Sequence, residues 1–159
     1  MGAPKSVTKI KKDGIEYVSN VEFCEYTIKE LTRGALRDVS KLIKKRFKEN
    51  YYKVFKKHSG NAGRVTYGKV YSSENTIKPR LEIGLPHSAP GKTVKGFYGY
   101  FQETGTSKQP KLGILRQTVE ENVANIVEIE SQYLSYLKDE AEALKHINEK
   151  EYTEETGDE

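Results

Sequence analysis

The sequence predicts an α+β fold, in which a small antiparallel sheet of three to four strands packs against an N-terminal amphipathic helix and a long C-terminal helix. Near both ends of the chain, apolar residues recur every three or four positions, as they do in helices that bury one face. Between these regions lie short alternating segments bounded by Gly and Pro, a pattern typical of strands and turns. Their connections are too short for crossover helices, which favours antiparallel pairing.

The N-terminal region is expected to be extended. Residues 1–13 carry scattered lysines and are predicted to form a flexible basic arm. The next segment alternates with the period of a strand, although a short extended lead-in fits equally well. Its alternating positions are Ile15, Tyr17, Ser19, Val21 and Phe23.

The first helix is predicted to run from Thr27 to about Lys56. Thr27 and Glu30 form a T-x-x-E capping box, in which each side chain can bind the other residue's backbone amide. The residues that follow form an apolar stripe at helical spacing, which should face the core. The stripe comprises Ile28, Leu31, Ala35, Val39, Leu42, Ile43 and Phe47, and extends through Tyr51, Val54 and Phe55.

The middle of the chain is predicted to form the sheet. A glycine-marked turn over 58–63 ends the first helix, and loops are expected over 73–78 and 86–95. Alternating aliphatic and aromatic residues predict three strands between and beyond these connections. They run from about Arg64 to Ser72, Arg80 to Leu85, and Phe97 to Glu103.

The C-terminal half returns to a helical period from about Leu112. If it continued to Ile147, this helix would be roughly 50 Å long, which exceeds the width of so small a sheet. Its second half, beyond about Ser131, is therefore expected to project or to pack on another subunit. Residues 149–159 are predicted to form an acidic disordered tail. The rest of the chain, residues 14–148, is predicted to form a single domain.

Charge is distributed unevenly along the chain, whose formal net charge is +4. Residues 1–70 carry +10, residues 71–118 carry +4, and residues 119–159 carry −10. This asymmetry fits three explanations: contact with nucleic acid, head-to-tail attraction between copies, or solvated helix faces. The basic residues of the first helix lie mainly away from its apolar stripe, at Arg33, Arg37, Lys41, Lys44, Lys45 and Lys48.

No catalytic, cofactor-binding or metal-binding group is predicted, so an enzyme is disfavoured. The solitary Cys24 excludes an internal disulfide, fits a reducing cytoplasm, and is expected to be a buried small apolar residue. The histidines lack metal-ligand spacing, and His146 is expected to be a solvated helix-face group. Gly60–Arg64 and Gly91–Thr93 match parts of a phosphate loop, but neither fits the full motif. No run of signal-peptide or membrane-spanning character appears, so neither secretion nor a membrane partner is expected.

The most informative segment runs from Tyr98 to Pro110. Residues 100–106 read Tyr-Phe-Gln-Glu-Thr-Gly-Thr and are followed by Pro110 and the Leu112–Arg116 segment. This arrangement resembles the gene-product-ten-like family of head–tail joining proteins of long-tailed bacteriophages, which are also called neck or tail-completion proteins. The resemblance covers about residues 27–125. The chain departs from the family pattern at Gly113, which is interposed, and at Gln117, where members carry a second proline.

The resemblance implies a structural virion protein that forms a ring, with expected six-fold symmetry, at the neck of the particle. The ring would join the portal or head-completion adaptor to the tail-tube or tail-terminator protein, and genomic DNA would pass through it without specific binding. Assembly would take place in the host bacterial cytoplasm. The alternative from a different class is a small basic-faced protein that binds nucleic acid without sequence specificity.

Partner and subunit contacts are expected at the basic face of the first helix and at two exposed connections. The basic face is expected to meet the acidic second helix of a neighbouring copy. Beyond the basic residues named above, the candidates are Pro86, His87, Pro90, Lys92, Lys95, Glu103, Gly105, Thr106, Lys108 and Pro110.

Overall fold

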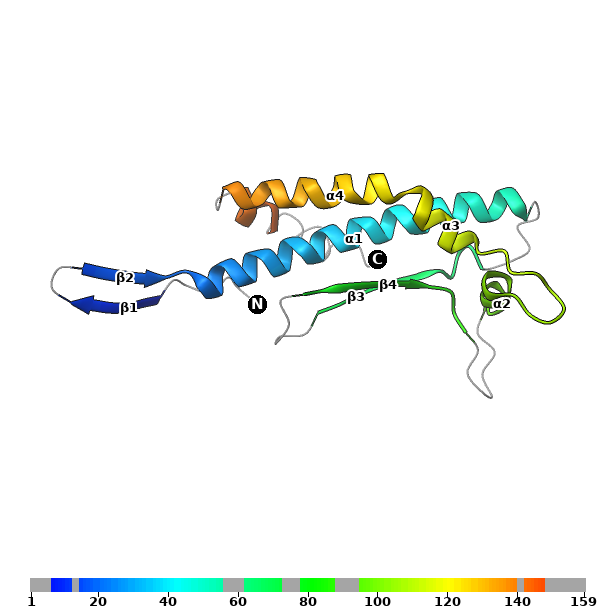
Figure 1. Cartoon of the computed structure of the whole chain (residues 1–159), viewed down its shortest axis with the longest axis horizontal. Coiled ribbons are helices and arrows are strands. Elements are labelled where there is room, and N and C mark those ends of the chain that lie inside the picture. The colour runs from blue at the N-terminus through cyan, green and yellow to red at the C-terminus, as the bar shows by residue number, and fades with distance from the viewer. Residues whose placement is uncertain are drawn as a thin grey trace, which may run out of the picture. The chain divides into compact units, whose positions relative to one another are not determined.

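The computed structural model describes residues 7–12, 15–55, 62–72, 78–87, 95–139 and 142–147. The fold is α+β, with a long N-terminal helix, a two-stranded antiparallel sheet packed against it, and several later helices (Figure 1). The chain forms two compact units. One takes its described residues from Met1–Ala35, Ser72–Arg80 and Glu130–Glu159, and the other from Leu36–Tyr71 and Leu81–Ile129.

The first unit contains an N-terminal hairpin of β1 (Val7–Lys12) and β2 (Ile15–Ser19). The strands are antiparallel, Val7 pairs with Ser19, and the register shifts between Thr8 and Ile10. Residues 7–12, which were expected to belong to a flexible basic arm over 1–13, form the strand β1, and residues 1–6 lie outside the described part.

Helix α1 (Val21–Val54) begins earlier than predicted and ends close to the predicted position. The Cys24 amide donates to the Asn20 carbonyl at 2.9 Å, and asparagine is among the preferred residues at a helix start. The capping box at Thr27 is therefore wrong. The Thr27 hydroxyl donates to the Phe23 carbonyl one turn earlier, at 2.9 Å, so Thr27 lies inside the helix.

The apolar stripe of α1 is confirmed over most of its length. Residues at a regular spacing of four are buried, namely Leu31, Ala35, Val39, Ile43, Phe47 and Tyr51. The two ends differ from expectation, because Ile28 and Val54 are exposed. Cys24 is also exposed, which corrects the prediction of a buried cysteine: it lies in the first turns of the helix, before the buried stripe begins.

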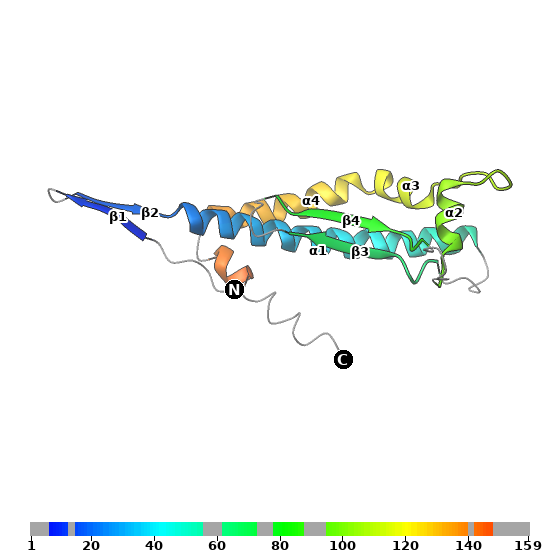
Figure 2. The same ribbon diagram turned by 90° about the horizontal axis from the view of Figure 1, so that it is seen from below.

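The strands β3 (Tyr67–Tyr71) and β4 (Arg80–Gly84) belong to the second unit, apart from Arg80. They form a two-stranded sheet, which lies alongside α1 in both ribbon views (Figures 1 and 2). The Tyr67 hydroxyl donates to Glu82 Oε1 across the strands at 3.1 Å. At Gly68 a β-carbon would overlap the Ser40 hydroxyl, so the glycine permits β3 to approach α1 closely. The described residues form two strands in this sheet, where three to four were predicted.

The third predicted strand is instead helix α2 (Tyr98–Thr104). Its aromatic residues suit either state, and a tertiary contact favours the helix. A β-carbon on Gly99 would lie 2.7 Å from Ala62 Cβ, so α2 packs its small residue closely against the segment after α1. The surrounding core consists of Phe47, Tyr51, Ala62, Leu85 and Ile114.

The predicted continuous C-terminal helix is divided into shorter elements. Helix α3 (Ile114–Glu121) is followed by α4 (Val123–Ser135) and the 3₁₀ helix η1 (Tyr136–Lys138), and residues 142–147 are again helical. Asn122 marks the first break. Its side-chain amide donates to the Thr118 carbonyl at 2.8 Å, and its backbone amide donates to Val119, so the α-helical pattern is interrupted there.

The C-terminal residues of the first unit form an aromatic cluster. Tyr133 is buried, and a β-carbon on Gly34 would lie 2.7 Å from its ring. The His146 ring stacks on Tyr136 with ring centres 4.3 Å apart, so the prediction of a solvated helix-face histidine is wrong. The predicted acidic tail, 149–159, lies outside the described residues.

Candidate functional site

Residues 105–113 connect α2 to α3, and Glu103, in the last turn of α2, supports the start of α3. The Leu115 amide donates to Glu103 Oε2 at 2.9 Å, and the Arg116 amide donates to Oε1 at 3.0 Å. The first amides of a helix have no partner within the helix and carry the positive end of its dipole. The Glu103 carboxylate therefore caps α3 from outside the helix.

Gly105 sits where the chain leaves α2, with φ 80° and ψ 166°. This combination is accessible almost only to glycine. A β-carbon there would also lie 2.9 Å from the Lys111 backbone nitrogen. Close by, the Leu112 amide donates to the Gln102 carbonyl at 2.9 Å, so the two ends of the connection are joined. Glycine is required at this position by both conformation and space.

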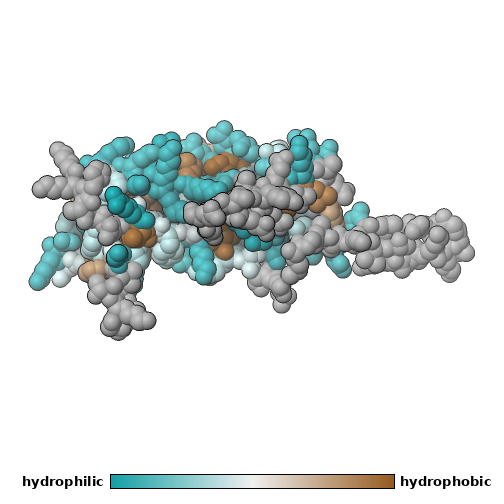
Figure 3. All heavy atoms as spheres, turned by 180° about the vertical axis from the view of Figure 1, so that it is seen from behind, coloured by the Kyte–Doolittle hydropathy of each residue, from teal (hydrophilic) through white to brown (hydrophobic). Residues whose placement is uncertain are grey.

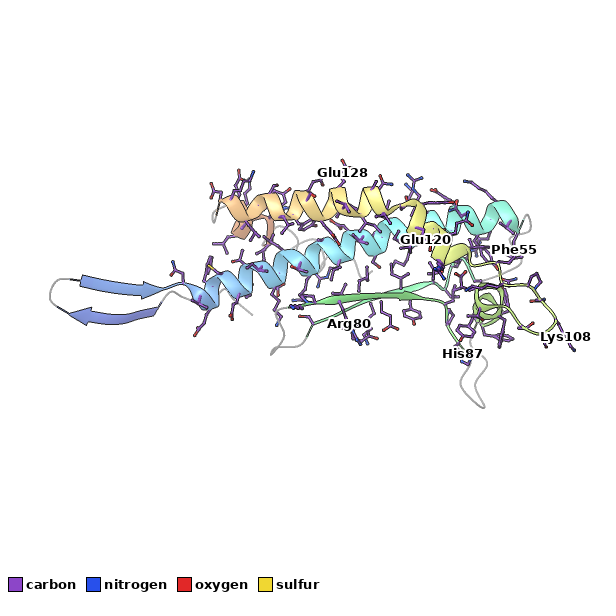
Figure 4. The ribbon with its side chains drawn as sticks, in the orientation of Figure 1. Phe55, Arg80, His87, Lys108, Glu120 and Glu128 are labelled. Carbon is purple, nitrogen blue, oxygen red and sulfur yellow. The ribbon has the colours of Figure 1, made fainter. Side chains whose placement is uncertain are left out.

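Thr106 organises the projecting part of the connection. Its backbone pairs with Gln109 in both directions, at 2.9 and 3.3 Å. The Thr106 hydroxyl accepts from the amides of Lys108 and Gln109, at 3.2 and 3.1 Å. The residues 106–112 are all exposed, and Lys108 lies at the far end of the loop (Figure 4). The result is a hydrogen-bonded loop that presents a solvated surface.

A tyrosine of α1 holds the other side of α2. The Tyr51 hydroxyl donates to Gln102 Oε1 at 2.8 Å. Burial, followed by the proximity of Tyr98, raises the pKa of Tyr51 to about 12. The ring is 3% exposed and lies 4.6 Å from that of Phe55. Tyr51 thus ties α2 into the core through both its ring and its hydroxyl.

His87 is the described histidine among the interface candidates. It is exposed and contacts Tyr100 edge to face, with ring centres 4.6 Å apart (Figure 4). Pro86 is half-buried and Lys95 is exposed at the two described ends of the same connection. The candidates Pro90 and Lys92 lie outside the described residues.

The six basic interface candidates of α1 fall into two groups. Arg33 pairs with Glu30 at 2.7 Å and Lys41 pairs with Asp38 at 3.6 Å, each within the helix. Arg37 also has a partner. The remaining three, Lys44, Lys45 and Lys48, make no ion pair with a described carboxylate.

These three lysines line an open hollow of about 400 Å³ in the second unit, together with Gly63, Arg64 and Thr66. Neither Arg64 nor Thr66 was among the predicted site residues. The only available signal was the Gly60–Arg64 stretch, which matched part of a phosphate loop. The sequence did not indicate that this stretch lies beside α1, because the two are brought together only by folding.

Helix α4 carries exposed apolar side chains. Val123, Val127 and Leu134 are 52%, 53% and 63% exposed and follow one another at helical spacing. On the face shown in Figure 3, hydrophilic residues predominate and hydrophobic surface occurs in small patches. Acidic Glu128 points outward from the same helix (Figure 4).

Among the described residues, no three His, Cys, Asp or Glu side chains are grouped so that they could hold a metal ion. None of the described helices combines the length and hydropathy needed to span a bilayer. Comparison with protein-family models, curated proteins and solved structures finds no match.

Proposed function

We propose that the chain is a structural virion protein of a tailed bacteriophage, which forms a ring at the head–tail interface. In that role it joins the portal–adaptor complex to the tail tube, and DNA passes through the ring. The proposal rests on the resemblance of residues 100–106 and Pro110 to the head–tail joining family.

The observation that carries the proposal is the role of each motif residue in the connection from α2 to α3. Glu103 caps α3, Gly105 supplies a backbone conformation that other residues rarely adopt, and Thr106 closes the loop. A motif whose residues hold a solvated loop in one shape suits a protein that docks onto others.

The surface of α4 supports contact between copies. Exposed valines and leucine occupy a helix that also carries acidic residues, and such apolar surface is stabilised when another chain covers it. A ring needs one face of each copy to meet a different face of the next. The basic side of α1 and the acidic side of α4 carry opposite charges, which suits such a contact between neighbouring copies.

Ring formation is tested by sedimentation velocity and negative-stain microscopy, with the chain alone and with the portal, adaptor and tail-tube proteins encoded in the same genome. We expect a ring or a stable complex with one of these proteins. A chain that stays monomeric in every mixture would contradict the proposal. Rising salt should weaken the assembly if the basic and acidic faces meet.

The loop is tested separately with Lys108→Glu, which reverses a charge at its far end. Lys53→Glu is the matched control, because it makes the same charge change at an exposed position in the last turn of α1. We expect Lys108→Glu to weaken complex formation more than the control does. Equal binding by both variants would remove the loop from the interface.

A further inference from the structure

We propose that the hollow between α1 and the 62–66 segment binds the phosphodiester backbone of a nucleic acid. The cations of the site are Lys44, Lys45, Lys48 and Arg64. Thr66 also lines the hollow, and its hydroxyl donates to the Ala62 carbonyl at 3.1 Å. It is argued from the chemistry of these residues and does not depend on ring formation.

The charge around the hollow is unbalanced. Lys44, Lys45, Lys48 and Arg64 are four cations around it, and none of their side chains forms an ion pair or hydrogen bond with another described residue. Elsewhere on α1, Arg33, Lys41 and Arg46 each pair with a carboxylate. Cations brought together without counter-charges repel one another, and an anion placed between them relieves this repulsion.

The fold brings these cations together from two segments of the chain. Lys44 and Lys48 are four residues apart, so both project from the same side of α1. Arg64 comes from a different segment, which the chain turns back against the helix at Gly63. A β-carbon on Gly63 would lie 3.3 Å from the rings of both Tyr51 and Tyr52, so a small residue lets this turn pack on the helix.

The lining of the hollow bears on which phosphate compound fits. None of the described residues that line it is aromatic, so they supply no ring on which a base could stack. Three of the four cations are lysines, which act as point charges on phosphate and do not form the bidentate contacts of arginine. This chemistry favours a sugar–phosphate backbone, without base recognition, over a bound nucleotide.

The test is binding of the full chain to a labelled DNA duplex of mixed sequence, measured by fluorescence anisotropy at several salt concentrations. Lys48→Gln/Arg64→Gln removes two cations of the hollow. Lys41→Gln/Arg46→Gln is the matched control, since it removes one lysine and one arginine from exposed positions that have carboxylate partners outside the hollow. Thermal unfolding of each variant establishes that it is folded.

We expect wild-type binding to fall steeply with salt, and the slope of log K against log salt to decrease by about two in magnitude in the hollow variant. Near 0.1 M salt, each lost contact should weaken binding roughly five- to tenfold. The control should bind within about threefold of the wild type.

Three results would overturn the proposal. The first is an equal loss in both double variants, which would mean that only total charge matters. The second is no duplex binding by the wild type at low salt. The third is stabilisation by inorganic phosphate, lost in the hollow variant, without duplex binding, because the site would then take a small free anion. A failure to form rings would leave these measurements unchanged, so the two proposals fail separately.

Discussion

Replacing Glu103 with alanine is expected to destabilise the second unit by about 2 kcal/mol. The carboxylate accepts from two backbone amides at the start of α3, at 2.9 and 3.0 Å. Removing a side-chain cap costs about 0.5–2 kcal/mol, and losing a negative charge beside a helix N-terminus costs about 0.3–1 kcal/mol more. Two kcal/mol lowers the melting temperature of a chain of this size by roughly 4–8 °C. Urea unfolding followed by circular dichroism measures the change.

Two further variants make this prediction specific. Glu103→Gln retains one carbonyl acceptor but loses the charge, so we expect it to cost about half as much as alanine. Glu120→Ala removes an exposed carboxylate that contacts Arg116 at 2.9 Å, and we expect it to cost less than about 0.5 kcal/mol. If Glu103→Ala and Glu120→Ala were equally mild, the capping role would be refuted.

Three further predictions concern Gly105, Phe47 and Tyr51 of the second unit. Gly105→Asn should cost roughly 1–3 kcal/mol because of its backbone angles. Gly113→Asn should cost under about 1 kcal/mol, because its φ is 60° and its ψ is 30°, and a β-carbon there would only contact the end of the Lys111 side chain at 3.8 Å. Chemical denaturation compares the two variants. Phe47→Ala should cost about 3–5 kcal/mol in the same assay, since the side chain is fully buried. The raised pKa of Tyr51 means that folding favours the protonated hydroxyl, so this contribution to stability is complete below pH 10 and is lost as pH rises through about 12. The free energy of unfolding measured from pH 9 to 12 should therefore fall less steeply in Tyr51→Phe than in the wild type. An identical pH profile in the two proteins would show that Tyr51 is not the group responsible.

The first helix was predictable because its signal is local and long. A stripe repeating every four residues from Leu31 to Tyr51 can bury one face only as a helix. The start was misplaced because the pair Thr27 and Glu30 has the composition of a capping box, while Glu30 instead binds Arg33. Two residues with the right spacing do not determine where a helix begins when the preceding turn can also be helical.

Helix α2 was beyond prediction from local pattern. Its seven residues are too few for a helical period to stand out, and its aromatic residues are equally typical of strands. The deciding contact, Gly99 against Ala62, joins segments far apart in the chain. The hollow could not be predicted for the same reason. Helical spacing placed its lysines on one side of α1, but Arg64 comes close to them only when the chain is folded.

The loop from Thr106 to Gln109 also bears on how a partner would be met. Ordering a free backbone costs about 1–2 kcal/mol per residue, and here internal hydrogen bonds have already ordered the loop when the chain folds. Association at this loop would therefore lose little conformational entropy. Cutting the chain between Thr106 and Gln109 would leave every contacting side chain present and still weaken association, because the loop would have to be ordered again each time a partner binds.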